Sequence, residues 1–378
     1  MKKVALVHDW LTGMRGGEKC LEILCELFPE ATVYTLLHKK GSVSDTISRM
    51  KIETSFVQNL PFGSSHYKKY LPLFPTAIEQ FDLTDFDLVI SSSHCVAKGV
   101  ITSSEACHIC YCHTPMRYAW EMYYTYFSKN SVSPLIRWSI PFFMNYLRTW
   151  DEKSADRVDH FVANSDNVRR RIKKHYRRDS EVIYPPVDTE YFDLSTKEGE
   201  FYLVVSALVP YKRIDLAVLA FNEMNLPLVI VGDGSEKKNL MKIGKKNIKF
   251  IDWQERSELK KYYAECKALI FPGEEDFGIV PVEAQACGKP VIAFGKGGAT
   301  ESVKGAYPDQ EITPSHTGIF FYPQAKEALI EAVRHFDSAR FYPQRIRENA
   351  LRFDKKVFKE KIKKFIEANF EEHKKNLR

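Results

Sequence analysis

The sequence predicts an α/β protein made of two doubly wound parallel sheets. Short apolar runs alternate with amphipathic helical patterns, which is typical of strands joined by crossover helices. The alternation stops once, at Pro185-Pro186 in EVIYPPVD, where a stiff linker is expected, and it restarts at Phe201. Because the chain has 378 residues, each half can bury its own core. We expect domains over residues 1–185 and 186–357, followed by a separate helix over 358–378.

Composition narrows the class of protein. The chain is 44% hydrophobic and 28% charged, which is typical of a globular protein, and its net charge of +6 is too small and too dispersed to indicate a nucleic-acid-binding surface. No apolar stretch reaches the length of a membrane span. Residues 1–8 lead into a strand pattern instead of a secretory signal, so we expect a cytoplasmic protein whose eight cysteines are free thiols.

The segment CHICYCH, residues 107–113, contains three cysteines and two histidines and could suggest a zinc site. Its apolar, β-rich character instead predicts a strand, in which neighbouring side chains point to opposite faces and cannot converge on one ion. We therefore expect buried strand thiols here, with a metal site as the less favoured alternative.

The first strand, Val4–Val7, precedes HDWLTGMRGGEK and an amphipathic helix. Gly16 and Gly17 allow the backbone to approach a ligand closely, and the following helix offers its positive end. The spacing does not match G-x-G-x-x-G, which argues against a nicotinamide enzyme. Arg15 directly precedes this glycine pair and is a further candidate for contact with such a ligand.

A later strand, Ile109–Cys112, leads to His113 and then to Arg117. Ligands gather at the carboxyl ends of strands in open α/β sheets. A single histidine at such a position is more often structural than catalytic, so by position alone His113 is a candidate, with Arg117 as a neighbouring candidate contact.

Three further segments leave alternatives open. Residues 56–81 and 132–150 combine aromatic and basic residues, so each could pack in the core or lie against lipid headgroups. The predicted helix around 169–178 is strongly basic and could be an ordinary solvated face or be attracted by an anionic membrane.

The second half repeats the alternation, with strands predicted at 201–206, 228–231, 248–251 and 268–271. Lys212 and Arg213 follow the first of these strands, where cations would meet a diphosphate. Trp253 follows the third and could stack on a nucleotide base.

The most informative stretch is FPGEEDFGIVPVEAQACGK, residues 271–289. A strand ends at Pro272, an acidic loop containing Glu275 follows, and a helix begins that carries Glu283. A helix N-terminus binds anions, and carboxylates beside it accept hydrogen bonds from hydroxyl groups. The pattern suits a sugar nucleotide, although the acidic residues alone would more often be a solvated cluster at a helix start.

Glu275, seven intervening residues and Glu283, with Phe277-Gly278 between them, resemble the signature of the family 4 glycosyltransferases. These are retaining enzymes with the GT-B fold, in which two Rossmann-like domains face each other across a cleft. The resemblance implies that Glu275 holds the donor sugar, that Glu283 holds the ribose, and that the amides of Phe277, Gly278 and Ile279 hold sugar and phosphate oxygens.

The same resemblance assigns further roles. It places His113 against the donor sugar, Gly16 and Gly17 against the diphosphate, and Lys212 on the leaving group. Ala207 departs from the family pattern, which commonly has an arginine there, and Arg213 is the expected substitute. The resemblance also implies that the final helix crosses back onto the first domain.

Within the family, four stretches together look most like GDP-mannose-dependent α-mannosyltransferases of O-antigen and exopolysaccharide assembly: HDWLTGMRGGEK, ICYCHTPMRYAW, VPYKRID and FPGEEDFGIVPVEAQACGKPVIA. That likeness implies a polyprenyl-diphosphate-linked glycan as acceptor, peripheral attachment to the inner face of the plasma membrane, and no metal or other cofactor. The alternatives are a UDP-sugar or other nucleotide-sugar donor and, as a different class, a non-catalytic scaffold that binds glycan or nucleotide.

Overall fold

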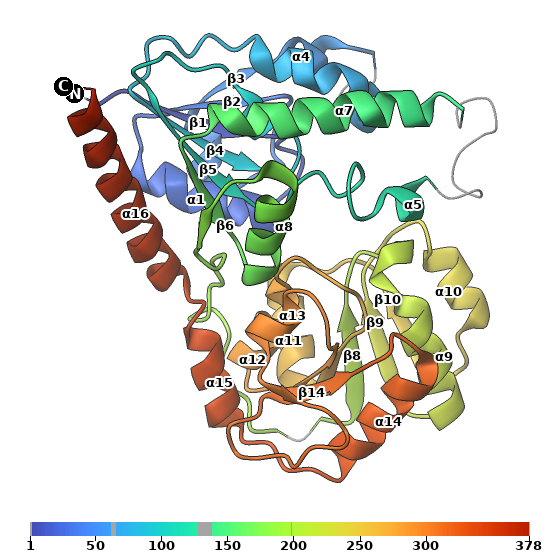
Figure 1. Cartoon of the computed structure of the whole chain (residues 1–378). Helices are drawn as coiled ribbons and strands as arrows, with labels where there is room; N and C mark the ends of the chain where they lie inside the picture. The colour runs from blue at the N-terminus through green and yellow to red at the C-terminus, as the bar shows by residue number, and fades with distance from the viewer. Residues whose placement is uncertain (1, 62–65, 128–137, 198, 378) are drawn as a thin grey trace. The chain divides into compact units, whose positions relative to one another are not determined.

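The computed structural model describes residues 2–61, 66–127, 138–197 and 199–377 (Figure 1). The chain divides into two compact units. The N-terminal unit comprises Met1–Pro186 with Lys356–Arg378, and the C-terminal unit comprises Val187–Lys355. Each unit contains a seven-stranded sheet in which the paired strands are parallel, as the sequence predicted.

The sheet of the N-terminal unit has the strand order β3-β2-β1-β4-β5-β6-β7. Its central strands are buried along their whole length, as expected when helices cover both faces. The strands are β1 (Val4–His8), β2 (Thr32–Thr35), β3 (Lys51–Thr54), β4 (Leu88–Ser93), β5 (Cys107–Cys112), β6 (His160–Ala163) and β7 (Ser180–Val182).

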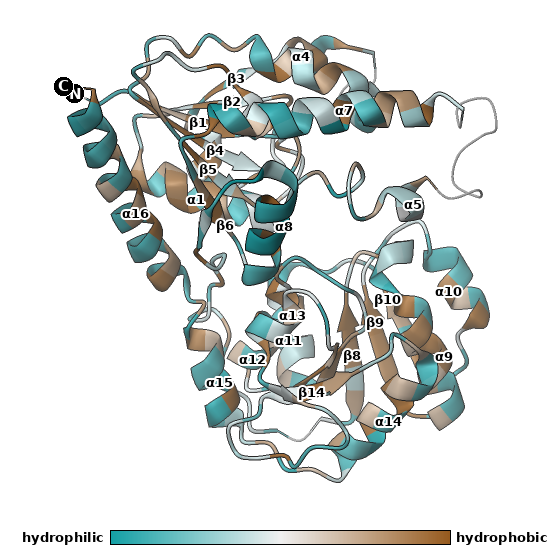
Figure 2. Ribbon diagram, in the orientation of Figure 1, coloured by the Kyte–Doolittle hydropathy of each residue, from teal (hydrophilic) through white to brown (hydrophobic). Residues whose placement is uncertain are grey.

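Helices connect these strands, and short 3₁₀ turns cover much of the stretch between β3 and β4. The α-helices are α1 (Gly16–Leu27), α2 (Asp45–Ser48), α4 (Phe74–Glu79), α5 (Tyr123–Tyr126), α7 (Ile140–Ser154), α8 (Asp166–Tyr176) and α16 (Lys355–Asn376). Ser165 caps α8, since its hydroxyl accepts a hydrogen bond from the amide of Val168 at 3.1 Å. Figure 2 shows the apolar strands in brown and the strongly polar α8 in teal.

The C-terminal unit has the strand order β10-β9-β8-β11-β12-β14-β13. Its strands are β8 (Phe201–Val205), β9 (Leu228–Val231), β10 (Ile248–Ile251), β11 (Cys266–Phe271), β12 (Val291–Phe294), β13 (Gly305–Ala306) and β14 (Gly318–Phe321). Its α-helices are α9 (Ile214–Met224), α10 (Lys237–Ile243), α11 (Arg256–Glu265), α12 (Ile279–Ala286), α13 (Ala299–Ser302), α14 (Lys326–Asp337) and α15 (Pro343–Leu351).

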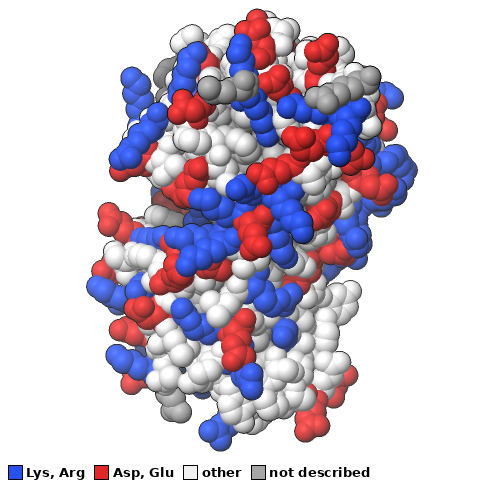
Figure 3. Space-filling view, turned by 90° about the vertical axis from the view of Figure 1, so that its left-hand side faces the viewer, with Lys and Arg blue, Asp and Glu red and all other residues white. Residues whose placement is uncertain are grey.

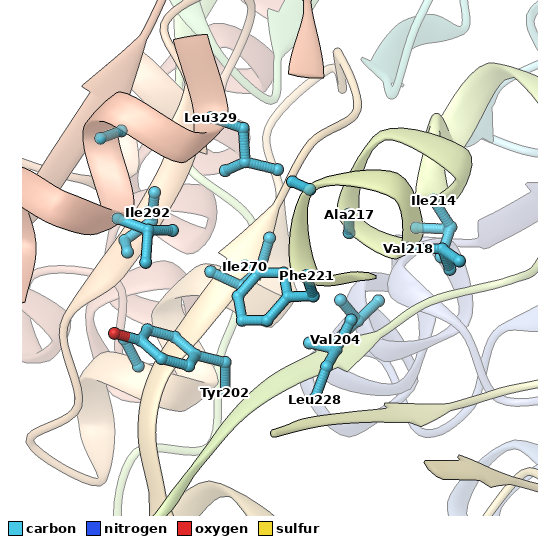
Figure 4. Packing of buried hydrophobic residues seen from close by; sticks show 14 of the residues in the cluster. Tyr202, Val204, Ile214, Ala217, Val218, Phe221, Leu228, Ile270, Ile292 and Leu329 are labelled. Atoms are coloured by element: carbon cyan, nitrogen blue, oxygen red, sulfur yellow. The ribbon is translucent and has the colours of Figure 1, made fainter. Parts of the chain in front are cut away.

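The core of this unit lies between the sheet and the helices α9 and α14 (Figure 4). Phe221 of α9 packs against Tyr202 of β8 with 5.0 Å between ring centroids, and Leu329 of α14 belongs to the same buried cluster. Ile270 and Ile292 extend this cluster across β11 and β12. The core thereby fixes the central strands, whose carboxyl ends carry the loops described below.

Each sheet has a reversal of strand order near its centre. In the N-terminal unit the reversal lies between β1 and β4, and in the C-terminal unit it lies between β8 and β11. At such a reversal the connections leave in opposite directions and open a crevice at the carboxyl ends of the two strands, where ligands of open α/β sheets bind.

Within the described part of the chain, no helix is both long enough and apolar enough to cross a bilayer.

Candidate functional site

In the C-terminal unit, the reversal of strand order brings Lys212 and Glu275 together. Lys212 lies just after β8 and Glu275 just after β11, and the ammonium group forms an ion pair with the carboxylate. Both side chains are mostly buried, at 14% and 18% exposed, and both line the same small pocket. The two candidates that the sequence placed 63 residues apart therefore share one site.

Two close backbone approaches hold this site in shape. A side chain on Gly273 would place its Cβ 3.0 Å from the carbonyl oxygen of Lys212, so glycine lets the two loops touch. The amide of Gly298 donates to the carbonyl of Glu275 at 2.8 Å, and Gly297 pairs with Glu275 as an isolated parallel bridge. The backbone of Glu275 is thus fixed independently of its side chain.

The amide-bearing end of α12 follows directly. Gly278 precedes the helix with φ of +89°, a conformation that favours glycine. Phe277 beside it is buried and packs edge-on against Phe353 at 5.3 Å between ring centroids. The amide of Ile279 opens the helix, so the first turn provides the kind of N-terminus that binds phosphate oxygens.

Glu283 lies in α12 and is buried. It accepts a hydrogen bond at 2.9 Å from the hydroxyl of Tyr263 on α11. Burial and this carboxylate hold the pKa of Tyr263 well above its usual range, so the phenol remains a donor. The Tyr263 contact orients the carboxylate and was not foreseen from the sequence.

Arg213 and Trp253 are the two remaining candidates of this unit. Arg213 has a left-handed backbone and pairs with Asp215 at 3.2 Å, and its guanidinium also reaches Gln324 at 3.4 Å. The expected contact of Arg213 with phosphate stays a prediction, and it requires the ion pair between Arg213 and Asp215 to break. Trp253, beyond β10, is 60% exposed, and its stacking on a base stays a prediction.

In the N-terminal unit, His113 belongs to a chain of polar side chains across three strand ends. Its Nε2 lies 2.8 Å from the hydroxyl of Ser92, which lies 3.1 Å from Nδ1 of His8. Burial and the neighbouring His94 and His8 hold the pKa of His113 well below its usual range. The ring is therefore neutral at physiological pH and can orient a hydroxyl group without carrying charge.

Gly17 lets α1 approach this chain. A Cβ at Gly17 would lie 3.2 Å from Cε1 of His8 and 3.5 Å from Nε2 of His113. Gly16 begins α1, and the preceding Arg15 is exposed while its amide donates to Glu18 at 3.0 Å. The helix start and the His113 ring therefore lie side by side.

Asp9 and His94 are functional candidates that the sequence analysis did not identify. The buried carboxylate of Asp9 accepts from four consecutive amides, those of residues 94–97, at 2.6 to 3.0 Å, and lies 3.0 Å from Nδ1 of His94. Burial lowers the pKa of His94 and the Asp9 carboxylate raises it, with a net rise above the usual value. The nearby Arg117 lowers this pKa. The motifs HDW and SSSH, each at the carboxyl end of a strand, were the available signal.

The cysteine cluster behaves as predicted for a strand. Cys107 and Tyr111 of β5 pack in one apolar cluster, while Cys110 and Cys112 pack in another on the opposite face. All eight cysteines are buried free thiols.

Comparison with known proteins relates both units to one class of enzyme. Residues 24–191 match the family model "Glycosyltransferase Family 4" and residues 189–353 match "Glycosyl transferases group 1". An uncharacterized glycosyltransferase of Methanocaldococcus jannaschii is 30% identical over 156 residues, covering 39% of this chain and 44% of that protein. The O-antigen chain mannosyltransferase RfbU of Salmonella typhimurium is 30% identical over 160 residues, covering 39% and 45%. The alignments thus span less than half of these relatives.

The fold is similar to that of solved glycosyltransferases over nearly the whole chain. The crystal structure of Anabaena HepE in complex with UDP superimposes with a TM-score of 0.67 at 18% identity, covering 97% of this chain and 100% of that chain. The two-sheet architecture described above is therefore the GT-B fold.

The buried histidine of β5 gives a testable pH dependence. Burial lowers the pKa of His108 to about 4, and its ring nitrogens contact Ser91 at 2.8 Å and the carbonyl of Arg157 at 3.1 Å. In the unfolded chain His108 takes up a proton below about pH 6.5, whereas in the folded protein it stays neutral down to about pH 4. Protonation of the unfolded chain therefore lowers the free energy of unfolding as the pH falls from about 6.5 toward 4. Between pH 7 and pH 5 the loss should be about 2 kcal/mol.

Urea unfolding at both pH values checks this. His108→Gln should show a decrease in unfolding free energy between pH 7 and pH 5 that is smaller than that of the wild type by the stated amount. An identical pH dependence in both proteins would show that His108 does not bind its proton as described.

Proposed function

Because both units carry glycosyltransferase domains, we propose that this chain is a retaining glycosyltransferase that moves mannose from GDP-mannose to a hydroxyl group of a lipid-linked oligosaccharide. The single observation that carries the proposal is the Lys212–Glu275 pair beside the start of α12. A cation, a carboxylate and the amide-bearing start of a helix suit a ligand that joins a diphosphate to a polyhydroxylated sugar.

In the proposed reaction the C-terminal unit holds the donor. Glu275 accepts hydrogen bonds from sugar hydroxyls, Glu283 accepts them from the ribose, and Trp253 stacks on the base. Lys212 and the amides of Gly278 and Ile279 stabilise the charge that develops on the leaving diphosphate. Fixed donors aimed at developing charge supply a large part of the rate in such sites.

The N-terminal unit serves the acceptor and the sugar. His113 is neutral and held by Ser92, so it can hydrogen-bond the sugar without competing for the leaving-group charge. The acceptor hydroxyl attacks on the face from which the diphosphate departs, which retains the anomeric configuration. Arg15 and Arg117 are proposed contacts for phosphate groups of the acceptor.

The proposal of mannose as the transferred sugar rests on similarity to known mannosyltransferases. The four motifs described above and the match to RfbU, an O-antigen chain mannosyltransferase, favour a mannosyl donor and a polysaccharide acceptor. A UDP-sugar is the second candidate donor, because the similar HepE structure contains UDP. A scaffold without activity is disfavoured by the presence of His113, Lys212, Glu275 and Glu283 together.

We further propose that α7 attaches the protein to the inner face of the plasma membrane. Four aromatic side chains are 46% to 70% exposed, one just before α7 and three in its N-terminal half: Trp138, Phe142, Phe143 and Tyr146. The opposite side of the helix is anchored by a buried ion pair of 2.9 Å between Lys98 and Asp151. Residues 132–137 of the predicted aromatic segment lie outside the described residues.

The basic helix α8 contributes less to this proposal than its sequence indicated. Arg171 lies 3.3 Å from Glu121, Lys173 pairs with Asp179 at 2.7 Å, and Arg178 donates to the carbonyl groups of Ala155 and Val158. These cations are partly neutralised or used within the fold. The aromatic face of α7 is therefore the main candidate for lipid contact.

Removal of either member of the central ion pair tests the catalytic proposal. Glu275→Ala and Lys212→Ala should each lower the rate of mannose transfer from GDP-mannose by at least about 100-fold, since each removes an interaction with the sugar or the developing charge. Lys296→Ala is the matched control, because Lys296 pairs with the adjacent Glu274 at 3.1 Å. Near-normal transfer by either site variant would refute the assignment, and ¹H NMR of the first-formed product should show the α-anomer.

Chelation tests the absence of a metal in the chemical step. With Lys212 and helix amides on the diphosphate, the initial rate of transfer should be unchanged in excess EDTA and should not rise when Mg²⁺ is added. A loss of rate that Mg²⁺ restores would contradict this mechanism.

Vesicle sedimentation tests the proposed membrane surface. Phe142→Ser should weaken binding to vesicles that contain anionic lipid by roughly tenfold, since a buried phenylalanine contributes about 1.5–3 kcal/mol. Met241→Ser, at a 53% exposed position on α10, is the control and should bind as the wild type does. Equal binding by the wild type and both variants would contradict the proposal that α7 contacts the membrane.

A further inference from the structure

Helix α16 packs on the sheet of the N-terminal unit through a single apolar stripe. Phe358, Ile362, Ile366 and Phe370 follow one another at intervals of four residues and are all buried. The outer side of the helix carries basic and acidic side chains, on the face seen in Figure 3. The next residue on the inner side, three positions after Phe370, is the half-buried His373.

His373 lies beside two other side chains that can bind metals. One donor atom each from Cys107, Asp159 and His373 lies within 4.8 Å of the other two. Cys107 begins β5 and Asp159 immediately precedes β6. The cluster therefore lies at the amino ends of these strands, whereas His113 follows the carboxyl end of β5, so the two groups of side chains occupy opposite ends of the sheet.

Second contacts already orient these side chains. Nε2 of His373 lies 3.1 Å from the carbonyl of Glu105, and donation of its N–H there leaves Nδ1 with a lone pair. One carboxylate oxygen of Asp159 accepts from the amide of His108 at 2.7 Å. Cys107 is fully buried, and its backbone is paired with Leu88 of β4. Metal-binding histidines and carboxylates are commonly oriented by such outer hydrogen bonds.

We propose that Cys107, Asp159 and His373 bind one zinc ion, which fastens the last turns of α16 to β5 and β6. Thiolate, imidazole and carboxylate are the ligands of tetrahedral zinc, whereas Mg²⁺ and Ca²⁺ prefer oxygen alone. Zinc bonds of about 2.0–2.3 Å place ligand atoms roughly 3.3–3.8 Å apart, so small side-chain rotations complete the site. Water fills the fourth position, and binding releases the thiol proton.

This set differs from the sequence cluster considered above. Cys110 and Cys112 of β5 lie on the face of the sheet opposite to Cys107, so the three cysteines do not converge, whereas Cys107 meets partners that are 52 and 266 residues away in the sequence. The proposed zinc ion has a structural role, because its site lies at the amino ends of the strands, away from the carboxyl ends that carry the proposed reaction. It does not depend on the proposed transferase activity.

Cobalt titration of the untagged, metal-stripped full chain tests the proposal. One equivalent of Co²⁺ should produce a thiolate-to-cobalt charge-transfer band in the near ultraviolet and the intense visible bands of a tetrahedral centre. Cys107→Ser should abolish the charge-transfer band. His373→Ala, a change at a partly exposed position, should weaken Co²⁺ binding by about 100-fold. Cys25→Ala, which removes another buried thiol of the same unit, is the control and should keep both signals.

A thermal measurement completes the test. Zn²⁺ should raise the melting temperature of the wild type and of Cys25→Ala, but not that of His373→Ala, whose fold is checked by circular dichroism. Absence of the charge-transfer band in the wild type, or equal Co²⁺ affinity in wild type and His373→Ala, would overturn the proposal.

Discussion

The reversal of strand order in each sheet is the constraint on which both groups of functional side chains depend. At each reversal two adjacent parallel strands send their connections in opposite directions, which leaves their carboxyl ends uncovered. In the C-terminal unit those ends carry Lys212 and Glu275, and in the N-terminal unit they carry His8 and Ser92. The chemistry therefore lies where the topology leaves backbone and side chains open to a ligand.

The charged and neutral side chains at the candidate sites differ between the two units. In the C-terminal unit, Lys212 and Glu275 neutralise each other while mostly buried, so neither charge is left without a partner before a donor binds. In the N-terminal unit, Asp9 places negative charge beside His94, while the neighbouring His113, whose ring centroid lies 6.3 Å from that of His94, stays neutral. Such a contrast between neighbouring histidines is typical of functional sites.

The sequence predicted the two sheets well because buried parallel strands are short apolar runs, such as Val4–Val7 and Ala268–Phe271, between glycine or proline turns. It also predicted the neighbourhood of Glu275, since that loop and helix are contiguous. It missed Asp9 with His94, because their contact spans 85 residues and depends on β1 pairing with β4. The Tyr263–Glu283 bond and the position of His373 were missed for the same reason: each requires knowing which elements pack together.

A thermal-shift titration with GDP, UDP, ADP and their sugar conjugates tests the central claim most directly, because it reports donor binding without needing the acceptor. A ligand at about 100 times its dissociation constant should add roughly 2.7 kcal/mol to the stability of the unit that binds it. We predict selective stabilisation by GDP and GDP-mannose. Preference for UDP and its sugars would contradict the mannosyl donor while leaving the glycosyltransferase fold intact, and no response to any nucleotide would contradict the account of the Lys212–Glu275 site.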